Sequence, residues 1–223
     1  MYKLSPSKAH RYLQCTASLK HDLPFTESPA SVRGSELHDI AEKILKKFDS
    51  QSLFNQYNLN DYERFLIESY VSAVLQEYER IKGKELIVEE KTRTEIFGMS
   101  LNMILDTLIL GRKSAIIIDL KTGNYNVDPE DNPQLMFYGY GVIMKYPKIK
   151  NLKLSIFQKG KMKSIDIKKG EVMDFFIEHA ETFEKISRNE LEYNPSEKAC
   201  KFCDYRDKCP ARAKWILERK DGE

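Results

Sequence analysis

The segment KELIVEEKTRTEIFGMSLNMILDTLILGRKSAIIIDLKT, residues 84–122, decides the fold of this chain. It is rich in isoleucine, valine, leucine and threonine, which favour β-strands. Phe97-Gly98 and Gly111-Arg112-Lys113-Ser114 interrupt this pattern with residues that favour turns. The segment therefore predicts a three-stranded antiparallel meander with strands at 84–96, 99–110 and 114–122.

The two turns fix which residues of the meander lie opposite each other. A turn centred between Phe97 and Gly98 pairs residues whose numbers sum to 195, and a turn centred between residues 112 and 113 gives a sum of 225. These sums place Glu89 opposite Asp106, and Asp106 opposite Asp119. Because like charges directly opposite each other destabilise a sheet, this row of three carboxylates calls for a cation.

Lys121 lies on the same face as Asp119, since side chains alternate along a strand. Residues 116–118 are all isoleucine, which indicates a strand buried on both faces. Carboxylate oxygens are the ligands that Mg²⁺ and Mn²⁺ prefer. Two alternatives stay open: a buried ion pair between Asp119 and Lys121, or a register shifted by one residue, which turns Glu89 or Asp106 to solvent. Whether Glu89 or Glu90 faces the row is also open.

The segments around the meander predict an α/β fold with a mixed central sheet flanked by helices. A short helix is expected at residues 7–19 with Ser5 or Ser7 as its cap, followed by a loop that contains proline. Asn132 and Pro133 have the residue types of a helix cap and first turn. Further helices are expected at 33–48, 61–81, 132–145 and 170–188, and further strands at 151–158 and 161–167.

Length and composition limit the number of domains and the class of protein. The chain has 223 residues, of which 41% are hydrophobic and 31% charged, which suffices for one sizeable core. We expect a single domain over 1–223, with a core at about 31–190. No apolar stretch has the length of a membrane span and no signal peptide is visible, so a cytoplasmic protein without membrane contact is expected.

The net charge is only +2, but the segment from Lys145 to Lys169 holds nine lysines and one acidic residue, Asp166. Such a run is usually a solvated face. On a sheet edge it is also suited to follow a phosphate backbone.

The chain has four cysteines, Cys15 near its start and Cys200, Cys203 and Cys209 near its end. The expected reducing compartment disfavours disulfides. Four thiolates suit either an iron–sulfur cluster or a structural zinc ion, and unrelated buried cysteines are a third reading. One shared metal centre would join the terminal segments 1–30 and 191–223.

The acidic residue on one strand, followed by Asp119-Leu120-Lys121 on the next, resembles the PD-(D/E)xK nuclease superfamily with its restriction-endonuclease-like core. More specifically, the chain is similar to the RecB-like branch, which includes CRISPR-adaptation exonucleases, AddB-type nuclease domains and phage proteins. Gly34-Ser-Glu-Leu-His38 matches the branch's histidine motif, and Gln134-Leu-Met-Phe-Tyr138 matches its Q-x-x-x-Y motif. One cysteine before the core and three after it match as well. The segments at 5–15 and 130–134 look like a phage-encoded branch.

This resemblance implies a role for each matching residue. A Mg²⁺ or Mn²⁺ ion would be held by His38, Asp106, Asp119 and the Leu120 carbonyl, with Glu89 as a direct or water-mediated ligand. Lys121 would orient the nucleophilic water, and Gln134 and Tyr138 would contact the scissile phosphate or orient Lys121. The residues that would hold a 4Fe–4S cluster, with zinc as the alternative, are Cys15, Cys200, Cys203 and Cys209.

The function that the resemblance implies is metal-dependent exonuclease hydrolysis of DNA, in phage recombination, replication or end processing. The expected partners are linear DNA, single-stranded or with free ends, and a second copy of the chain or a phage recombination protein. The expected location is the cytoplasm, that of the host cell for a phage protein. The alternative is a non-catalytic nucleic-acid-binding or interaction module with a structural zinc site.

Overall fold

A computed structural model of the chain describes residues 2–21, 28–47 and 49–220. The strands of these residues form one sheet in the order β1-β3-β4-β5-β6, with β2 paired to β3. The sheet is mixed, because β3–β4 and β5–β6 are antiparallel whereas β1–β3 and β4–β5 are parallel. The strands are β1 (Lys3–Leu4), β2 (Glu85–Ile96), β3 (Met99–Leu110), β4 (Ser114–Lys121), β5 (Asn151–Gln158) and β6 (Lys161–Lys168).

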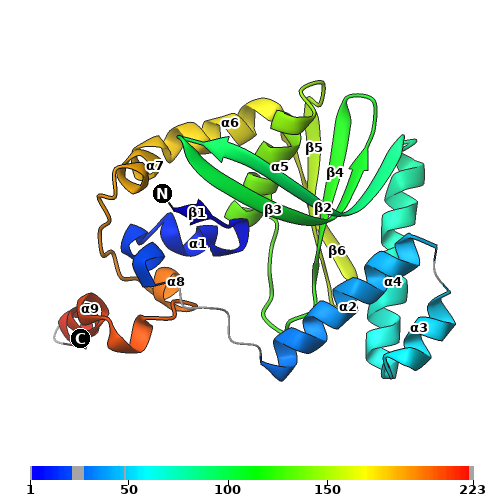
Figure 1. Cartoon of the computed structure of the whole chain (residues 1–223), viewed down its shortest axis with the longest axis horizontal. Helices are drawn as coiled ribbons and strands as arrows, with labels where there is room; N and C mark the ends of the chain where they lie inside the picture. Colours follow the sequence, from blue (N-terminus) through cyan, green and yellow to red (C-terminus); the bar gives the residue numbers. More distant parts are fainter. Residues whose placement is uncertain (1, 22–27, 48, 221–223) are drawn as a thin grey trace. The chain divides into compact units, whose positions relative to one another are not determined.

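Helices flank this sheet, and the predicted fold class is confirmed in this respect (Figure 1). The α-helices are α1 (Ala9–Tyr12), α2 (Pro29–Leu45), α3 (Ser50–Gln56), α4 (Asp61–Arg80), α5 (Pro133–Lys145), α6 (Lys169–Glu178), α7 (Ala180–Ser187), α8 (Glu197–Cys200) and α9 (Pro210–Lys220). The short 3-10 helices are η1 (Pro6–Lys8), η2 (Thr16–His21) and η3 (Arg206–Lys208).

The chain divides into two compact units. Unit 1 comprises the described residues of Met1–Phe25, Arg93–Asn102 and Asp174–Glu223. Unit 2 comprises those of Thr26–Thr92 and Met103–Met173. The strands β2 and β3 run through both units, and the turn that joins them belongs to unit 1.

The meander has the predicted register between β3 and β4. Thr107 pairs with Ile118, and Leu110 pairs with Ala115, so the sum of 225 is confirmed. At the other turn, β2 and β3 leave only Phe97 and Gly98 between them, with φ angles of 47° and 73°. Two consecutive residues with positive φ are typical of the type I′ turn that suits a tight hairpin.

Unit 2 has helices on both faces of its strands. Ile116, Ile118 and Leu120 of β4 belong to a buried cluster with α2, α3 and α4. Because side chains alternate along a strand, Ile117 and Asp119 point to the opposite face. There α5 packs against β4 and β5. The isoleucine run at 116–118 is therefore buried on both faces of the strand, as the sequence predicted.

The helix caps follow the sequence signals in unit 2. Asn60 caps α4, and its side chain and that of Glu63 bond each other's backbone N–H in a capping box. Asn132 caps α5, and Pro133 occupies the first turn, as predicted. Ser28 caps α2, which thus begins four residues before the predicted start at residue 33. The last predicted residue of that helix, Phe48, and most of the predicted proline-containing loop (22–27) lie outside the described residues.

The helix predicted at 7–19 is wrong as a continuous element. The structure has η1, α1 and η2 in its place, with a break before Thr16. The Ala17 N–H donates to the Glu192 carbonyl at 3.0 Å, and the Glu192 N–H donates to Thr16 Oγ1 at 2.8 Å. These tertiary bonds with a distant segment of unit 1 replace the helical bonds that the local sequence favours.

Two other helical predictions need correction. The helix predicted at 170–188 is broken into α6 and α7 at His179, whose Nδ1 lies 2.9 Å from the Phe175 carbonyl. The backbone N–H of His179 donates to the same carbonyl at 3.3 Å, so the side chain and the backbone share one acceptor at the break. Helix α3 was not predicted; its cap is Asp49, whose side chain accepts a bond from the Ser52 N–H.

The lysine run is largely a solvated face with ion pairs. Lys145 pairs with Glu90, and Lys153 pairs with Glu77 at 2.8 Å. Lys161, Lys163 and Lys168 lie exposed on β6, which is an edge strand of the sheet. Lysines on an edge strand hinder pairing with other chains, which explains much of the run without nucleic acid.

A buried hydrogen bond joins α4 to β3 beneath the acidic row. The Tyr70 hydroxyl lies 2.8 Å from Thr107 Oγ1, and both residues are almost fully buried. We expect Thr107→Val to lower the free energy of unfolding by about 1–3 kcal/mol, because it leaves the tyrosine hydroxyl without a partner. Urea denaturation measures this loss. The double variant Thr107→Val with Tyr70→Phe should recover most of it; a double variant that is additively destabilised would contradict this account.

Candidate metal centre and active site

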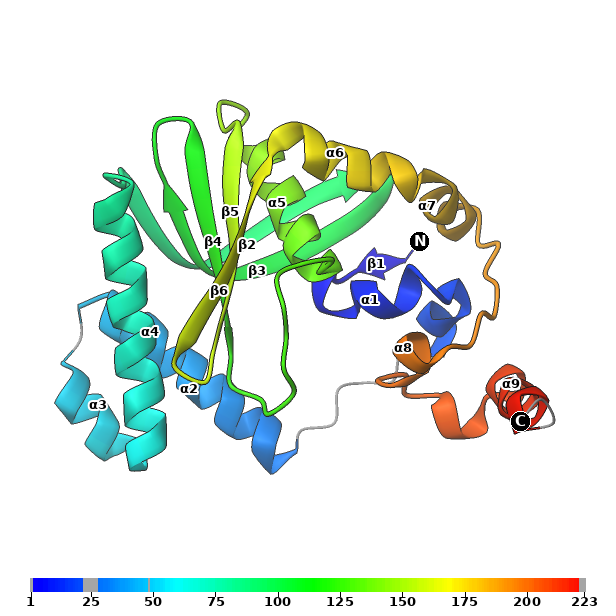
Figure 2. The ribbon, with the colours of Figure 1, turned by 180° about the vertical axis from the view of Figure 1, so that it is seen from behind.

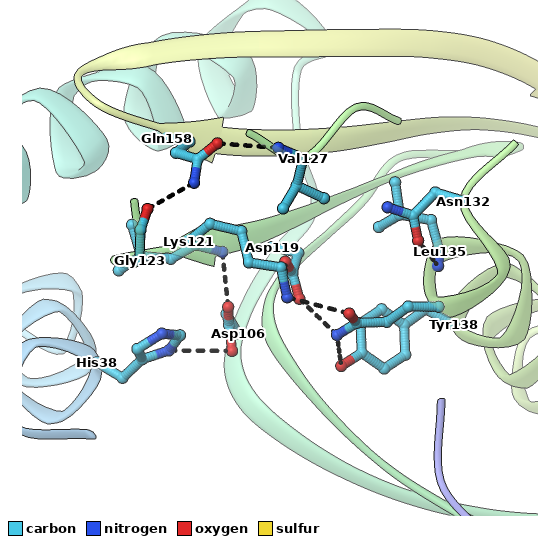
Figure 3. Close-up of polar contacts among 12 residues, drawn as sticks. His38, Asp106, Asp119, Lys121, Gly123, Val127, Asn132, Leu135, Tyr138 and Gln158 are labelled. Atoms are coloured by element: carbon cyan, nitrogen blue, oxygen red, sulfur yellow. Dashed lines mark hydrogen bonds and ion pairs between the residues drawn. The ribbon is translucent and has the colours of Figure 1, made fainter. Parts of the chain in front are cut away.

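Gly34, the first residue of the histidine motif, lies where α2 approaches the end of β4. A Cβ atom added to Gly34 would lie 3.0 Å from Thr122 Oγ1, so the glycine allows the close approach of the helix. His38 lies four residues later on the same side of α2. Its Nδ1 is 3.3 Å from Asp106 Oδ1, and the two side chains point toward each other (Figure 3).

Three potential ligands meet here from three different elements. His38 on α2, Glu89 on β2 and Asp106 on β3 each offer an atom, and these atoms lie within 4.8 Å of one another. One imidazole nitrogen and two carboxylate oxygens suit Mn²⁺, and Mg²⁺ also takes the carboxylates. These residues therefore form a candidate centre for a divalent cation.

A β-bulge in β2 carries Glu89. Next to the turn, Ile96 lies opposite Met99, and their residue numbers sum to 195. At the far end of the hairpin, the Lys84 N–H donates to the Leu110 carbonyl, so the numbers of the paired residues there sum to 194. Between these points β2 holds one extra residue, and Glu89 has a positive φ of 53°. An extra residue with left-handed backbone re-aims its neighbouring side chains.

The structure thus places Glu89, and not Glu90, beside His38 and Asp106. Glu90 instead forms an ion pair with Lys145 of α5. The predicted pairing of Glu89 near Asp106 holds, although the uniform register from which it was calculated does not extend along all of β2.

Asp119 of β4 lies next to the three potential ligands. It follows Ile118, which pairs with Thr107 of β3. Only 3% of its side chain is exposed. Oδ1 accepts a hydrogen bond from Gln134, and Oδ2 forms an ion pair with Lys121 Nζ at 2.8 Å. A carboxylate oxygen has more than one lone pair, so Asp119 can also ligate a cation. The Asp119–Lys121 ion pair, weighed above as an alternative, coexists with the acidic row.

Leu120 is fixed by its neighbour on β3. Its backbone N–H donates to Asp106 Oδ2 at 2.7 Å. This bond uses one Asp106 oxygen and leaves Oδ1 facing His38. The role of the Leu120 carbonyl as a ligand stays a prediction.

Gln134 links the amine and the carboxylate. Its Oε1 accepts a bond from Lys121 Nζ at 3.0 Å, and its Nε2 donates to Asp119 Oδ1 at 3.0 Å and to the Tyr138 hydroxyl at 2.8 Å. Gln134 and Tyr138 lie one turn apart on α5, so their side chains meet. Of the two roles considered for Gln134, the observed bond corresponds to orientation of Lys121.

The electrostatics of the group favour a bound cation. Burial, opposed by Lys121 and reinforced by Asp106, raises the pKa of Asp119 to about 6. Burial and the charge of Asp106 also raise the pKa of Glu89. Burial lowers the pKa of His38, but the hydrogen bond and charge of Asp106, with the charges of Asp119 and Glu89, outweigh it and raise that pKa. The carboxylates therefore destabilise one another when all are ionised.

The four cysteines all belong to unit 1 and are free thiols. Together with His21, Tyr193 and Tyr205 they line one cavity. Burial, with the neighbouring Cys15 and Cys203, raises the pKa of Cys200, so the thiol is protonated unless a cation draws off the proton.

Several residues that complete the site were not predicted. Tyr70 and Thr107 support the acidic row from below, and Gln158 holds the loop that follows Lys121. Their roles depend on contacts between segments far apart in sequence, so no local motif signals them. Gly34 alone had a sequence signal, as the first residue of the histidine motif.

The fold and this site define an α/β protein with a mixed sheet and a carboxylate-rich centre at the end of its central strands. A family model described as "Protein of unknown function (DUF2800)" matches residues 2–223, and the chain belongs to this family. The structure has the fold of a candidate exonuclease from Eubacterium rectale, with a TM-score of 0.53 and 11% sequence identity over 92% of this chain and 87% of that one. The solved structure of SSO0001 has a TM-score of 0.47 and 13% identity over 95% of this chain and 88% of that one.

None of the described helices is both long and apolar enough to cross a membrane.

Proposed function

We propose that this chain is a metal-dependent deoxyribonuclease that hydrolyses DNA from its ends. The observation that carries the proposal is the convergence of His38, Glu89 and Asp106 within 4.8 Å, next to the Asp119–Lys121 pair. Acidic groups that repel one another are otherwise a cost to the fold, and a divalent cation offsets that cost.

The chemistry of the donors fits the proposed ion. His38, Glu89, Asp106 and Asp119 would hold Mg²⁺ or Mn²⁺, with the Leu120 carbonyl completing the set. When bound, such an ion supplies a water of lowered pKa and polarises the phosphoryl oxygen. The burial of Asp119 beside Asp106 supports this assignment, because a single lysine does not offset two neighbouring carboxylates.

The chain's own residues position the reacting groups. Lys121 donates hydrogen bonds to the attacking water or to the phosphate, where negative charge develops. Gln134 accepts a bond from the same ammonium and donates to Asp119 and Tyr138, so it fixes the distance between amine and carboxylate. Tyr138 is buried and restricts the rotation of Gln134.

The same proposal assigns a 4Fe–4S cluster to the four cysteines. All four thiols line one cavity of unit 1, so one centre can draw on them together. Four thiolates suit a 4Fe–4S cluster or a zinc ion. The resemblance of the cysteine positions to those of iron–sulfur nucleases supports the cluster, with zinc as the alternative.

A role in phage recombination, replication or end processing belongs to the proposal as well. It is supported by the resemblance of the segments at 5–15 and 130–134 to a phage-encoded branch of the RecB-like nucleases. Its partners would be DNA with free ends and a second copy of the chain or a phage recombination protein, in the cytoplasm.

Lys121→Met tests the proposed function. We expect it to slow cleavage of end-labelled linear DNA in Mg²⁺ or Mn²⁺ by about 100- to 1,000-fold, because one charge-stabilising donor is lost. Closed circular DNA, single-stranded and duplex, serves as a substrate without ends. Lys148→Met makes the same change at an exposed lysine and should cleave like the wild type.

Full activity of Lys121→Met would refute the site. Cleavage of circular DNA as fast as linear DNA would show endonuclease action in place of exonuclease action. A wild-type protein that binds DNA but cleaves none of these substrates in either metal would favour the non-catalytic binding module.

A further inference from the structure

One row of side chains faces the cavity of the four cysteines from η2 (Thr16–His21). Cys15, Ser18 and His21 are three residues apart, and all three line this cavity. The Ser18 N–H donates to the Cys15 carbonyl at 3.0 Å, as expected of 3-10 geometry. A 3-10 helix has three residues per turn, so side chains at this spacing lie above one another. The row therefore places a hydroxyl between a thiol and an imidazole at the wall of the cavity.

A second segment of unit 1 brings the other cysteines to the same cavity. Helix α8 ends at Cys200 and packs against α1, which ends at Tyr12, shortly before Cys15 (Figure 2). In the loop before α8, the Asn194 N–H donates to the Cys15 sulfur at 3.4 Å. The surroundings of the cavity thus already offer one hydrogen bond to a sulfur atom.

Ser18 carries a buried hydroxyl whose partner the protein does not supply. Only 2% of the residue is exposed, and among the described residues no atom forms a hydrogen bond with its Oγ. A buried hydroxyl without a partner is unfavourable, because it has given up its bonds to water. The place of this hydroxyl in the row therefore indicates an acceptor inside the cavity.

His21, the next member of the row, is already engaged. Its Nε2 lies 2.7 Å from the Tyr193 hydroxyl, and its ring stacks on that of Tyr205 with the two centroids 3.8 Å apart. These three rings line the cavity and hold one another in place. Within the row, the Ser18 hydroxyl is therefore the donor that is available to a group bound by the cysteines.

We propose that the Ser18 hydroxyl donates a hydrogen bond to a sulfur atom of the metal centre that the four cysteines hold. This inference rests on the metal centre of the proposed function and gives it a residue that is not a ligand. Metal-bound thiolates are negatively charged, and a hydrogen bond to sulfur stabilises that charge. In an iron–sulfur cluster the bond raises the reduction potential, because the reduced cluster carries one more negative charge.

Ser18→Ala tests this bond by a property of the metal centre, without a measurement of DNA cleavage. The full chain, purified without oxygen, is titrated with redox mediators and followed by visible absorbance. We expect the equilibrium constant for reduction to fall by up to about tenfold, a shift of about 59 mV to more negative potential for one electron. Ser18→Thr keeps the hydroxyl and should recover most of the wild-type potential. Ser187→Ala makes the same change at an exposed position of unit 1 and should have no effect.

Deuterium exchange detects the same bond in the wild type. Transfer into D₂O should shift the Fe–S stretching bands of the resonance Raman spectrum, because the hydroxyl proton on sulfur is replaced by deuterium. The shift should be smaller in Ser18→Ala, with a remainder from the Asn194 N–H. A purely structural role of Ser18 would not change the response to D₂O.

A Ser18→Ala protein with the wild-type potential and the wild-type response to D₂O would overturn the bond, and so would a wild type whose bands do not shift. In both cases the cysteine centre stands and only this inference fails. Loss of all metal in Ser18→Ala that Ser18→Thr restores would support the bond, whereas the same loss in both variants would overturn it.

A colourless wild type with one zinc per chain would refute the iron–sulfur proposal and leave this inference to be judged on zinc. Competition with a chelator should then show an affinity for zinc that is roughly tenfold lower in Ser18→Ala and is restored in Ser18→Thr. Equal affinities would overturn the bond. A wild type that holds neither metal would overturn both the centre and this inference, whatever the result for DNA cleavage.

Discussion

Asp119→Asn is expected to abolish metal-dependent DNA hydrolysis and to stabilise the metal-free protein at the same time. The loss of activity follows from the removal of a charged ligand in the middle of the acidic row. We expect it to exceed the effect of Lys121→Met and to reach roughly 1,000-fold or more, because a charge that preorganises the site is lost. The gain in stability follows from the electrostatics of the folded state.

The sign of the stability effect comes from the direction of the pKa shift. The pKa of Asp119 is raised from 3.8 to about 6 in the folded protein, mainly by burial. The folded state therefore binds the proton more tightly than the unfolded state does. The stabilising contribution of the protonated group is fully present below about pH 4 and is lost as the pH rises through about 6. Asparagine stays neutral and removes this dependence.

At pH 7 in a metal chelator, Asp119→Asn should be more stable than the wild type by about 1–3 kcal/mol. The difference should shrink toward pH 4. Mn²⁺ should raise the melting temperature of the wild type and have little effect on the variant, because the ion stabilises the ionised carboxylate. Urea denaturation and thermal melts measure these quantities.

Asp174→Asn is the matched control, since it makes the same change at an exposed position on α6. It should change neither activity nor stability. An Asp119→Asn protein that is less stable than the wild type at pH 7 without metal would contradict the account of a strained acidic row. Retained cleavage would contradict the proposed site.

Replacement of a single cysteine is expected to have the largest effect on stability. If one metal centre binds Cys15 and the three C-terminal cysteines, it closes a loop of nearly the whole chain. By the entropy of loop closure alone, such a link is worth about 5 kcal/mol. A typical domain has a net stability of about 5–15 kcal/mol, so the loss is a large part of the total.

Cys203→Ser should therefore be colourless, sensitive to proteases in unit 1 and strongly destabilised, whereas the wild type purified without oxygen should be brown and contain iron and sulfide. Visible absorbance, metal analysis and limited proteolysis measure these differences. Because the four thiolates act together, the double variant Cys15→Ser with Cys203→Ser should lose little more stability than either single variant.

Additive losses in the double variant would contradict a shared centre. A colourless wild type with one zinc per chain would refute the iron–sulfur proposal and support the zinc alternative. Replacement of Tyr2 by phenylalanine removes an exposed hydrogen bond to Asn189 in the same unit and should leave colour and stability unchanged.

The sequence predicted the strands of unit 2 well because their signals are local. The alternation of apolar and polar residues, the turn residues and the isoleucine run at 116–118 can each be recognised from a few consecutive residues. The register of β3 against β4 could therefore be calculated from the sequence. The calculation for β2 was less complete, because a bulge has no reliable sequence signature. Glu89 has a left-handed backbone without a glycine to announce it.

The helical predictions failed where other hydrogen bonds, one set tertiary and one local, compete with those of a continuous helix. The first predicted helix breaks before Thr16 because Glu192 offers that segment other hydrogen bonds. The long predicted helix bends at His179, where a side chain bonds the carbonyl of Phe175. A local sequence pattern around Thr16 carries no information about Glu192, which lies 176 positions further along the chain.

By itself, the sequence determined which residues form strands β2 to β6, but not β1, and that Asp106 and Asp119 share a face, because turns and a period of two residues are local signals. Tertiary structure alone decided that Glu89 joins His38, that Gln134 bonds Lys121, and that Gln158 fastens the loop beside the site. The physical reason is that a site is assembled from several elements, and the distances between them depend on how the core packs.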